Sequence, residues 1–369
     1  MGHIFPTIST AWALRAAGHE VLYASGGHHE LVAHAGLPVV DCAPGVDFGA
    51  IFRAGMAEMG QGFGAARGFQ AEDQAGLEFV TRLFARVSQP FVERTVALAR
   101  TWRPDLIITT PMQGAGPLAA EVVGAPVVVH GLNFSPVGGL AGLLAAEMAP
   151  AYEKYSAERR AVDAVIDVAP PSMRVGESAE PLLHTRYVPY NGGAVLPDWV
   201  VEPRTGARIV VTLGSVVPQL GGIAALRPFV AAAGEVDAEF VLAMGGADLS
   251  ALGTLPDNLR PVDWVPLGSL LRNADAIVHH GGAGTTLTAL DAGIPQYVTP
   301  QGADQHMNAE AVARRGAGDV LAADDLDSAR LNALLHNGDF AVAAKEVSAE
   351  MAGQPGPAAM VGDLAGLVR

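Results

Sequence analysis

The sequence predicts an α/β protein made of two doubly wound domains, each with a parallel sheet covered by helices, facing one another across a cleft. Short apolar runs alternate with helical patterns in both halves of the chain, which is typical of repeated strand–helix units. The runs are continuously apolar rather than alternating, as expected for strands buried on both faces of a parallel sheet. The chain has 369 residues, which is enough for two such domains.

The first half contains a clear series of predicted elements. Residues 7–17 are rich in Ala and Leu and predict a helix, and Gly18 suits the position after its last residue. Strands are expected over 19–24, 39–41, 104–110 and 125–130, and helices over 77–100 and 116–123. Because a parallel sheet that starts with a helix lacks its first strand, we expect a strand immediately before Gly2.

Residues 45–75 have no clean period and mix Gly, Met and Phe with polar residues, which predicts a mobile loop region. Its apolar side chains are either the lining of a ligand site or ordinary core: Phe52, Met56, Met59, Phe63 and Phe69.

The second half repeats the same rhythm. Strands are expected over 208–213, 239–244, 274–279 and 296–299, with helices after the first of them, over 285–292, and in a segment that includes 308–316. Residues 187–206 are rich in Pro and Gly and predict a linker. The expected domains are therefore 1–186 and 207–369, with the last helix packing back on the first domain.

Composition excludes several classes of protein. The net charge of −15 argues against a nucleic-acid partner, because phosphate contacts require a basic surface. The single cysteine, Cys42, allows neither an internal disulfide nor a Cys/His metal cluster. No apolar stretch reaches the ~18–20 residues of a membrane span, and the first residues lack the pattern of a signal peptide. We expect a cytoplasmic protein.

The most informative segment is a glycine turn between a strand and a helix, residues 277–286. Small residues let a ligand approach the backbone, and the free amides of a first helical turn favour an anion such as a diphosphate. The segment matches neither the dinucleotide-binding fingerprint nor the P-loop. An ordinary strand–helix turn with glycines is the alternative interpretation.

Several further motifs follow in order: Pro295-Gln296, residues 300–305 and Asn308-Ala309, with residues 2–6, 15–21, 104–105 and 116–120 in the first half. Together with the glycine turn, this series resembles the nucleotide-sugar glycosyltransferases of two Rossmann-like domains, the GT-B architecture. It is most similar to the bacterial enzymes that tailor antibiotics and other natural products. The resemblance covers nearly the whole chain.

The resemblance implies a role for each matching residue. The donor diphosphate would be held by His280, Gly282, Ala283, Gly284 and Thr285, with Gly214 and Ser215; the nucleobase by Trp264 and Val265; and the sugar hydroxyls by Asp304 and Gln305. Simpler interpretations are that Trp264 belongs to the core, that Ser215 caps a helix, and that Asp304 and Gln305 lie in a solvated loop.

His3 matches the catalytic histidine of the family, and an imidazole is suited to take a proton from an acceptor hydroxyl. One departure concerns Thr110, which stands where many relatives carry an aspartate that orients this histidine. Either another carboxylate serves, or the acceptor is more acidic.

The resemblance thus implies an inverting glycosyltransferase that moves a deoxysugar from a dTDP-sugar or UDP-sugar to a hydroxyl of a hydrophobic, polyketide-like or aromatic acceptor. No cofactor and no obligatory metal are expected, since Asp325 and Asp327 suit a helix cap better than a metal site. We allow for a homodimer. The alternatives are a non-catalytic auxiliary relative, a nucleotide-sugar epimerase, and an oxidoreductase, although the nicotinamide fingerprint is missing.

Overall fold

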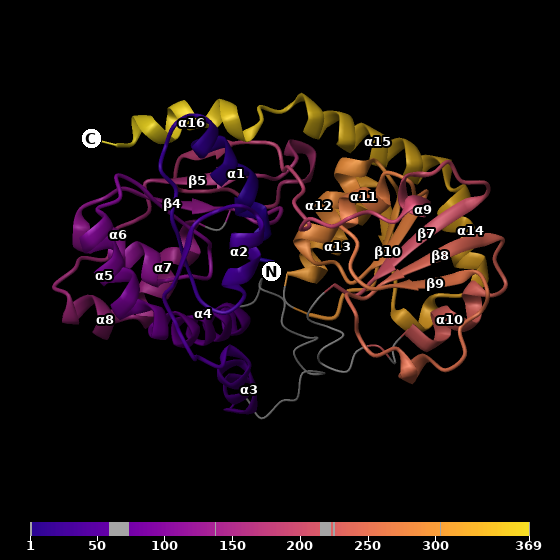
Figure 1. The fold of residues 1–369 in the computed structure, drawn as a ribbon, viewed down its shortest axis with the longest axis horizontal. Coiled ribbons are helices and arrows are strands. Elements are labelled where there is room, and N and C mark those ends of the chain that lie inside the picture. The colour runs from indigo at the N-terminus through magenta and orange to yellow at the C-terminus, as the bar shows by residue number, and fades with distance from the viewer. Residues whose placement is uncertain are drawn as a thin grey trace. The chain divides into compact units, whose positions relative to one another are not determined.

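The computed structural model describes residues 2–58, 74–136, 138–214, 223, 226–302 and 304–368. The chain forms two compact units (Figure 1). Unit 1 contains Tyr187–Gly353 with Pro170–Met173 and residues 2–5, and unit 2 contains Pro6–Ala169, Arg174–Arg186 and Gln354–Arg369.

Unit 1 is built on a sheet of six parallel strands in the order β12-β11-β10-β7-β8-β9. The strands are β7 (Ala207–Thr212), β8 (Ala238–Ala243), β9 (Leu259–Val262), β10 (Ala276–His279), β11 (Gln296–Val298) and β12 (Gly318–Val320). Strands after β7 are added on one side and strands after β9 on the other, so the order reverses between β7 and β10. In doubly wound folds, ligands bind at the carboxyl ends of the strands at this reversal point.

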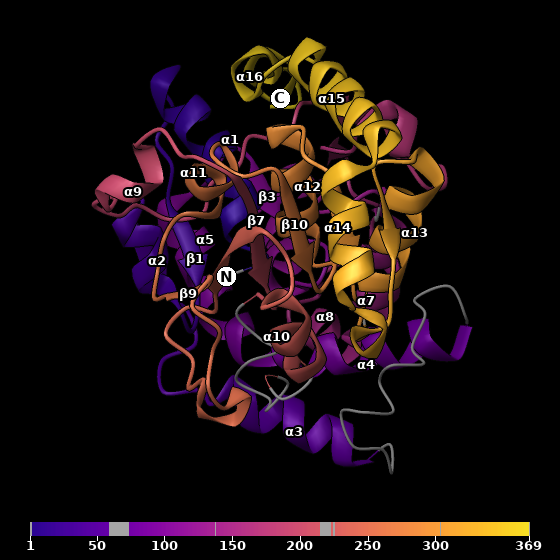
Figure 2. The same cartoon turned by 90° about the vertical axis from the view of Figure 1, so that its right-hand side faces the viewer.

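Helices cover both faces of this sheet. They are α9 (Asp198–Val201), α10 (Arg227–Ala233), α11 (Leu267–Leu271), α12 (Ala283–Ala292), α13 (Gln305–Arg315), α14 (Ser328–His336) and α15 (Gly338–Gly353), with short 3₁₀ turns over Pro171–Met173, Ser250–Leu252 and Ala323–Asp325. Successive residues of β7 point to opposite faces: Ile209 packs in a cluster with α10 and α14, whereas Val210 packs in a cluster with α9, α11 and α12. Figure 2 shows α10 and α14 in front of β7 and β10.

Unit 2 contains two parallel sheets, β1-β2 and β3-β4-β5-β6. The strands are β1 (Tyr23–Ser25), β2 (Val39–Asp41), β3 (Ile107–Thr109), β4 (Val127–His130), β5 (Ala164–Asp167) and β6 (Leu182–His184). The helices are α1 (Phe5–Ala16), α2 (His29–His34), α3 (Phe48–Glu58), α4 (Gln74–Ser88), α5 (Val92–Trp102), α6 (Ala115–Val123), α7 (Gly138–Glu147), α8 (Ala149–Lys154) and α16 (Pro357–Gly366), with a 3₁₀ turn over Gln89–Phe91. Within the described ranges no strand joins the two sheets, and the strand expected before Gly2 stays a prediction.

Two predicted segments differ from the structure. The single helix expected over 77–100 is broken at Pro90, where α4 ends and a 3₁₀ turn leads into α5, because proline has no N–H to donate inside a helix. The loop expected over 45–75 is wrong for residues 48–58, which form α3; there the ring of Phe52 packs edge-on against Phe84 at 5.6 Å. Met59, Phe63 and Phe69 lie outside the described residues.

None of the helices in the described parts of the chain combines the length and the apolar character that a membrane span requires.

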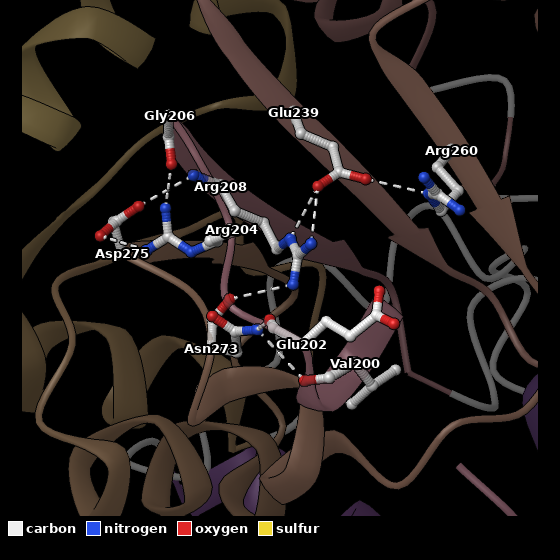
Figure 3. A network of polar contacts seen from close by, with 9 residues as sticks. All are labelled: Val200, Glu202, Arg204, Gly206, Arg208, Glu239, Arg260, Asn273 and Asp275. Atoms are coloured by element: carbon white, nitrogen blue, oxygen red, sulfur yellow. Dashed lines mark hydrogen bonds and ion pairs between the residues drawn. The ribbon is translucent and has the colours of Figure 1, made fainter. Parts of the chain in front are cut away.

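A polar network ties the segment before β7 to the amino ends of the strands (Figure 3). The side chain of Arg208 is 4% exposed and binds the Glu239 carboxylate through Nε and Nη2, both at 2.8 Å. Glu239 also accepts a hydrogen bond of 2.9 Å from Arg260. The guanidinium groups of both arginines lie over the ring of Trp199, at 5.2 and 4.9 Å from its centre. These contacts anchor α9 to the amino ends of β7, β8 and β9, at the end of the sheet away from the reversal point.

Glu239→Ala should therefore destabilise unit 1 without changing ligand affinity at the carboxyl ends of the strands. Removing the carboxylate leaves the Arg208 guanidinium buried without its ion pair, which costs about 2–4 kcal/mol. Thermal unfolding measures the loss, and Arg260→Ala, which removes a more exposed pair, should cost less than about 1 kcal/mol. Equal effects of the two substitutions would contradict this account.

Candidate active site

The glycine turn lies at the reversal point, directly after β10. Gly281 has a φ of +89°, and a Cβ there would lie 2.8 Å from Val298 Cγ1 and 3.0 Å from the carbonyl oxygen of Gln305. Only glycine adopts this conformation in this space without strain. Gly282 is extended (φ −61°, ψ 135°) and α12 begins at the next residue.

The start of α12 presents backbone amides to this edge of the sheet. The first hydrogen bond of the helix is donated by the amide of Thr286 to the carbonyl of Gly282. The amides of Ala283, Gly284 and Thr285 therefore have no partner from the helix itself. Together with the positive end of the helix dipole they form a site suited to a diphosphate.

The imidazole of His280 lies between two glycines. A Cβ on Gly214 would lie 2.5 Å from Cε1 of this ring, and a Cβ on Gly282 would overlap with its Nε2, so a side chain at either position would displace the ring. Gly214 follows β7, whose Thr212 pairs with His279 of β10, so neighbouring strands bring the two segments together. Ser215 lies outside the described residues.

The His280 ring is neutral near pH 7. Burial lowers its pKa to about 4, although a hydrogen bond with the backbone of Thr212 acts in the opposite direction. Its Nδ1 atom is buried and, among the residues that the structure describes, has no hydrogen-bond partner. A buried nitrogen without a partner is costly, and a ligand at the start of α12 could satisfy it.

Asp304 and Gln305 stand at the beginning of α13, next to the glycine turn. Asp304 Oδ2 accepts a hydrogen bond of 3.2 Å from Asn308 Nδ2, and Gln305 Oε1 accepts one of 2.8 Å from the amide of Gln301. The close approach of the Gln305 carbonyl to Gly281 places both residues beside the turn. They therefore lie at a helix start rather than in a freely solvated loop.

Trp264 follows β9 and is 44% exposed, so it does not belong to the core. Gly192, with a φ of +82°, backs its indole ring, because a Cβ there would lie 3.3 Å from ring atoms. Val265 packs instead in the apolar cluster beneath. An exposed indole ring supported from behind is suited to stacking on a base.

His3 belongs to unit 1 through the contacts of the first residues, and the ring of Phe5 packs edge-on against Tyr190 at 5.1 Å. Desolvation of the His3 imidazole lowers its pKa, and the charge of Asp304 acts in the opposite direction. Among the described residues, Asp304 is a carboxylate whose charge acts on His3. Thr110 belongs to unit 2.

Some features of the site have no role in the sequence-based assignment. His279, Gln296 and Asn308 occur in the motifs, but the sequence alone does not show their contacts with the turn.

Asp327 accepts a hydrogen bond of 2.8 Å from the amide of Arg330 at the start of α14, so its predicted role as a helix cap is confirmed.

Known proteins resemble this chain over almost its whole length. Two family models match the chain: the N-terminal domain of erythromycin biosynthesis protein CIII-like proteins over residues 12–214, and the C-terminal domain over 227–367. The elloramycin glycosyltransferase ElmGT of Streptomyces olivaceus is 42% identical over 97% of this chain and 92% of its own.

Solved structures agree with the sequence comparison. The glycosyltransferase SnogD of Streptomyces nogalater matches with a TM-score of 0.86 at 40% identity, covering 100% of this chain and 97% of its own. The spinosyn rhamnosyltransferase SpnG, solved in complexes with thymidine diphosphate and with spinosyn aglycone, matches with TM-scores of 0.80 and 0.81 at 28% identity, over 99% of this chain and 97% of its own. The chain is a GT-B glycosyltransferase that belongs to the erythromycin biosynthesis protein CIII-like family of antibiotic-tailoring enzymes.

Proposed function

We propose that the protein is an inverting glycosyltransferase that transfers a deoxysugar from a dTDP-sugar to a hydroxyl of a hydrophobic natural-product aglycone, in the cytoplasm. The observation that carries the donor assignment is the buried Nδ1 of His280, which has no partner among the described residues, beside the first-turn amides of α12 that no bond within the helix engages. Thymidine diphosphate bound to SpnG supports thymidine over uridine, and the spinosyn aglycone bound to the same relative supports an acceptor of this class.

In the proposed reaction, the acceptor oxygen attacks the anomeric carbon from the face opposite the diphosphate. The new C–O bond forms as the bond to the diphosphate breaks, which inverts the anomeric centre. His3 takes the acceptor proton. The backbone amides in the first turn of α12 stabilise the negative charge that develops on the leaving diphosphate. Asp304 and Gln305 would bind the sugar hydroxyls, and Trp264 would stack on the thymine.

Leaving-group stabilisation in this scheme comes from backbone amides, the helix dipole and His280, so the reaction is proposed to need no metal. Asp327 instead caps α14, because its carboxylate accepts a hydrogen bond from the amide of Arg330.

The direct test is to incubate the purified chain with a dTDP-deoxysugar and a polycyclic aromatic or macrolide aglycone, and to follow dTDP release and the anomeric configuration of the product. An inverted glycoside formed only in the presence of acceptor supports the proposal. Donor conversion without acceptor would support an epimerase, and binding without turnover would support the auxiliary protein.

His280→Ala should weaken dTDP binding while the chain stays folded. Losing a hydrogen bond to a charged phosphate costs about 1.5–3 kcal/mol, which corresponds to about 10- to 150-fold in the dissociation constant. Isothermal titration calorimetry measures the affinity, and His280→Gln, which keeps a side-chain donor, should lose less. Unchanged dTDP affinity in the alanine variant would exclude His280 from the donor site.

A further inference from the structure

Buried side chains hold both backbone polar groups of Gly281, its N–H and its carbonyl. Its N–H donates to Nδ1 of His279 at 3.0 Å, and its carbonyl accepts from Nδ2 of Asn308 at 2.8 Å. His279 and Asn308 are both 0% exposed. The peptide that starts the turn is therefore fixed from β10 on one side and from α13 on the other.

The hydrogen bonds of His279 determine its tautomer. Because Nδ1 accepts from the Gly281 amide, the proton of the neutral ring must lie on Nε2, which donates to Oε1 of Gln296 at 2.7 Å. Burial lowers the pKa of this ring to about 3, with the neighbouring His280 contributing in the same direction and the Gln296 bond opposing it. The ring is thus neutral over the working pH range, and the acceptor at Nδ1 is maintained.

The amide of Asn308 has a similarly fixed orientation. Its Nδ2 donates both to the Gly281 carbonyl and to Oδ2 of Asp304 at 3.2 Å, and two acceptors can be satisfied only by the NH₂ group. Asn308 thus joins the glycine turn to the carboxylate at the start of α13.

We propose that His279 and Asn308 are positioning residues for the donor: by holding the Gly281 peptide they aim the first amides of α12, and Asn308 sets Asp304 relative to them. This inference rests on the proposed donor site. Neither side chain touches the diphosphate; each acts through the backbone of the turn or through Asp304.

The first experiment compares two substitutions of His279 by calorimetry with dTDP on the full chain. Leucine removes the acceptor, whereas asparagine can place its Oδ1 on the amide two residues ahead, the same connection that Nδ1 makes. We expect His279→Leu to weaken dTDP binding about 10- to 100-fold and His279→Asn to restore affinity to within about 3-fold of the unmodified chain. Hydrogen exchange at the Gly281 amide should speed up in the leucine variant only.

A matched control is His130→Leu. His130 is 1% exposed and bonded to Thr10 Oγ1 at 2.9 Å in unit 2, so its loss should lower thermal stability without altering dTDP affinity. If both leucine variants weaken dTDP binding alike, the effect is general destabilisation and the inference is overturned.

A second variant tests the tautomer in case His279→Leu does not fold. In Gln296→Glu, the new carboxylate raises the His279 pKa, and protonation puts a hydrogen on Nδ1 that repels the Gly281 amide. The ratio of variant to unmodified dissociation constants should then be high at acid pH and fall as the pH rises. A ratio that is constant with pH overturns the assignment of Nδ1 as the acceptor.

The outcomes separate this inference from the proposed function. If the unmodified chain does not bind dTDP, the donor proposal fails, while Gly281 exchange still reports on the turn. If the unmodified chain binds dTDP and His279→Leu binds equally well, the donor proposal stands and the positioning role is wrong.

Discussion

His3→Ala is expected to lower kcat by about 10²–10⁴, the usual contribution of a general base, with donor affinity almost unchanged. The loss should be largest for aliphatic alcohol acceptors and smaller for phenols, which release their protons more readily. Steady-state assays with one acceptor of each kind measure the difference. Full activity of the variant on an aliphatic alcohol would exclude His3 as the base.

The pH dependence of kcat/KM provides a second test of the role of His3. A base must be deprotonated, so kcat/KM should rise with pH as His3 loses its proton. We expect a rising limb that reports the His3 pKa, which desolvation lowers and the charge of Asp304 raises. His3→Ala should lack this limb. His19→Ala, at an exposed histidine after α1, should keep both the limb and the rate.

Gly281→Ala is expected to have the largest effect on the donor site itself. The positive φ is unfavourable for alanine, and the added Cβ would collide with Val298 and the Gln305 carbonyl, at a total cost of about 2–4 kcal/mol. Since the turn must shift to relieve the collision, dTDP affinity should fall together with thermal stability.

Gly284→Ala is the matched control for the effect of this substitution on stability. The position lies inside α12, and the nearest atom to an added Cβ is the Tyr187 hydroxyl at 3.5 Å, an ordinary contact. Because alanine favours a helix over glycine, this variant should be as stable as the unmodified chain or more so. A Gly284→Ala chain that is less stable than Gly281→Ala would contradict the account of the turn.

The strands around the donor site were predictable from the sequence because their apolar runs are continuous. Residues 276–279 and 207–212 follow this pattern, and both form central strands of unit 1. Edge strands such as Leu182–His184 and Gly318–Val320 could not be predicted, since three residues with one neighbour have too short a pattern. In α3, the mixture of Gly and Met hides a helical period that packing against α4 stabilises.

The site shows the same limit at the level of single residues. Motif order led to His280 and Asp304, but it gave no reason to single out His279, because its function depends on which ring nitrogen meets the Gly281 amide. Trp264 is the converse case: the sequence alone fits a core residue and a surface residue equally, and the 44% exposure of its side chain shows that it lies at the surface.

The course of the chain between the units has a consequence for building hybrid enzymes. The chain leaves unit 2 after Arg186 and returns to it at Gln354, and near these two points the amide of Arg186 donates to the carbonyl of Pro355 at 2.9 Å, while α16 packs against β6. In topological terms, Tyr187–Gly353 is an insertion into unit 2 rather than a second half of the chain. A chimera that swaps donor specificity should therefore exchange residues 187–353 and keep the native α16, because a single junction after 186 would give β6 a foreign helix.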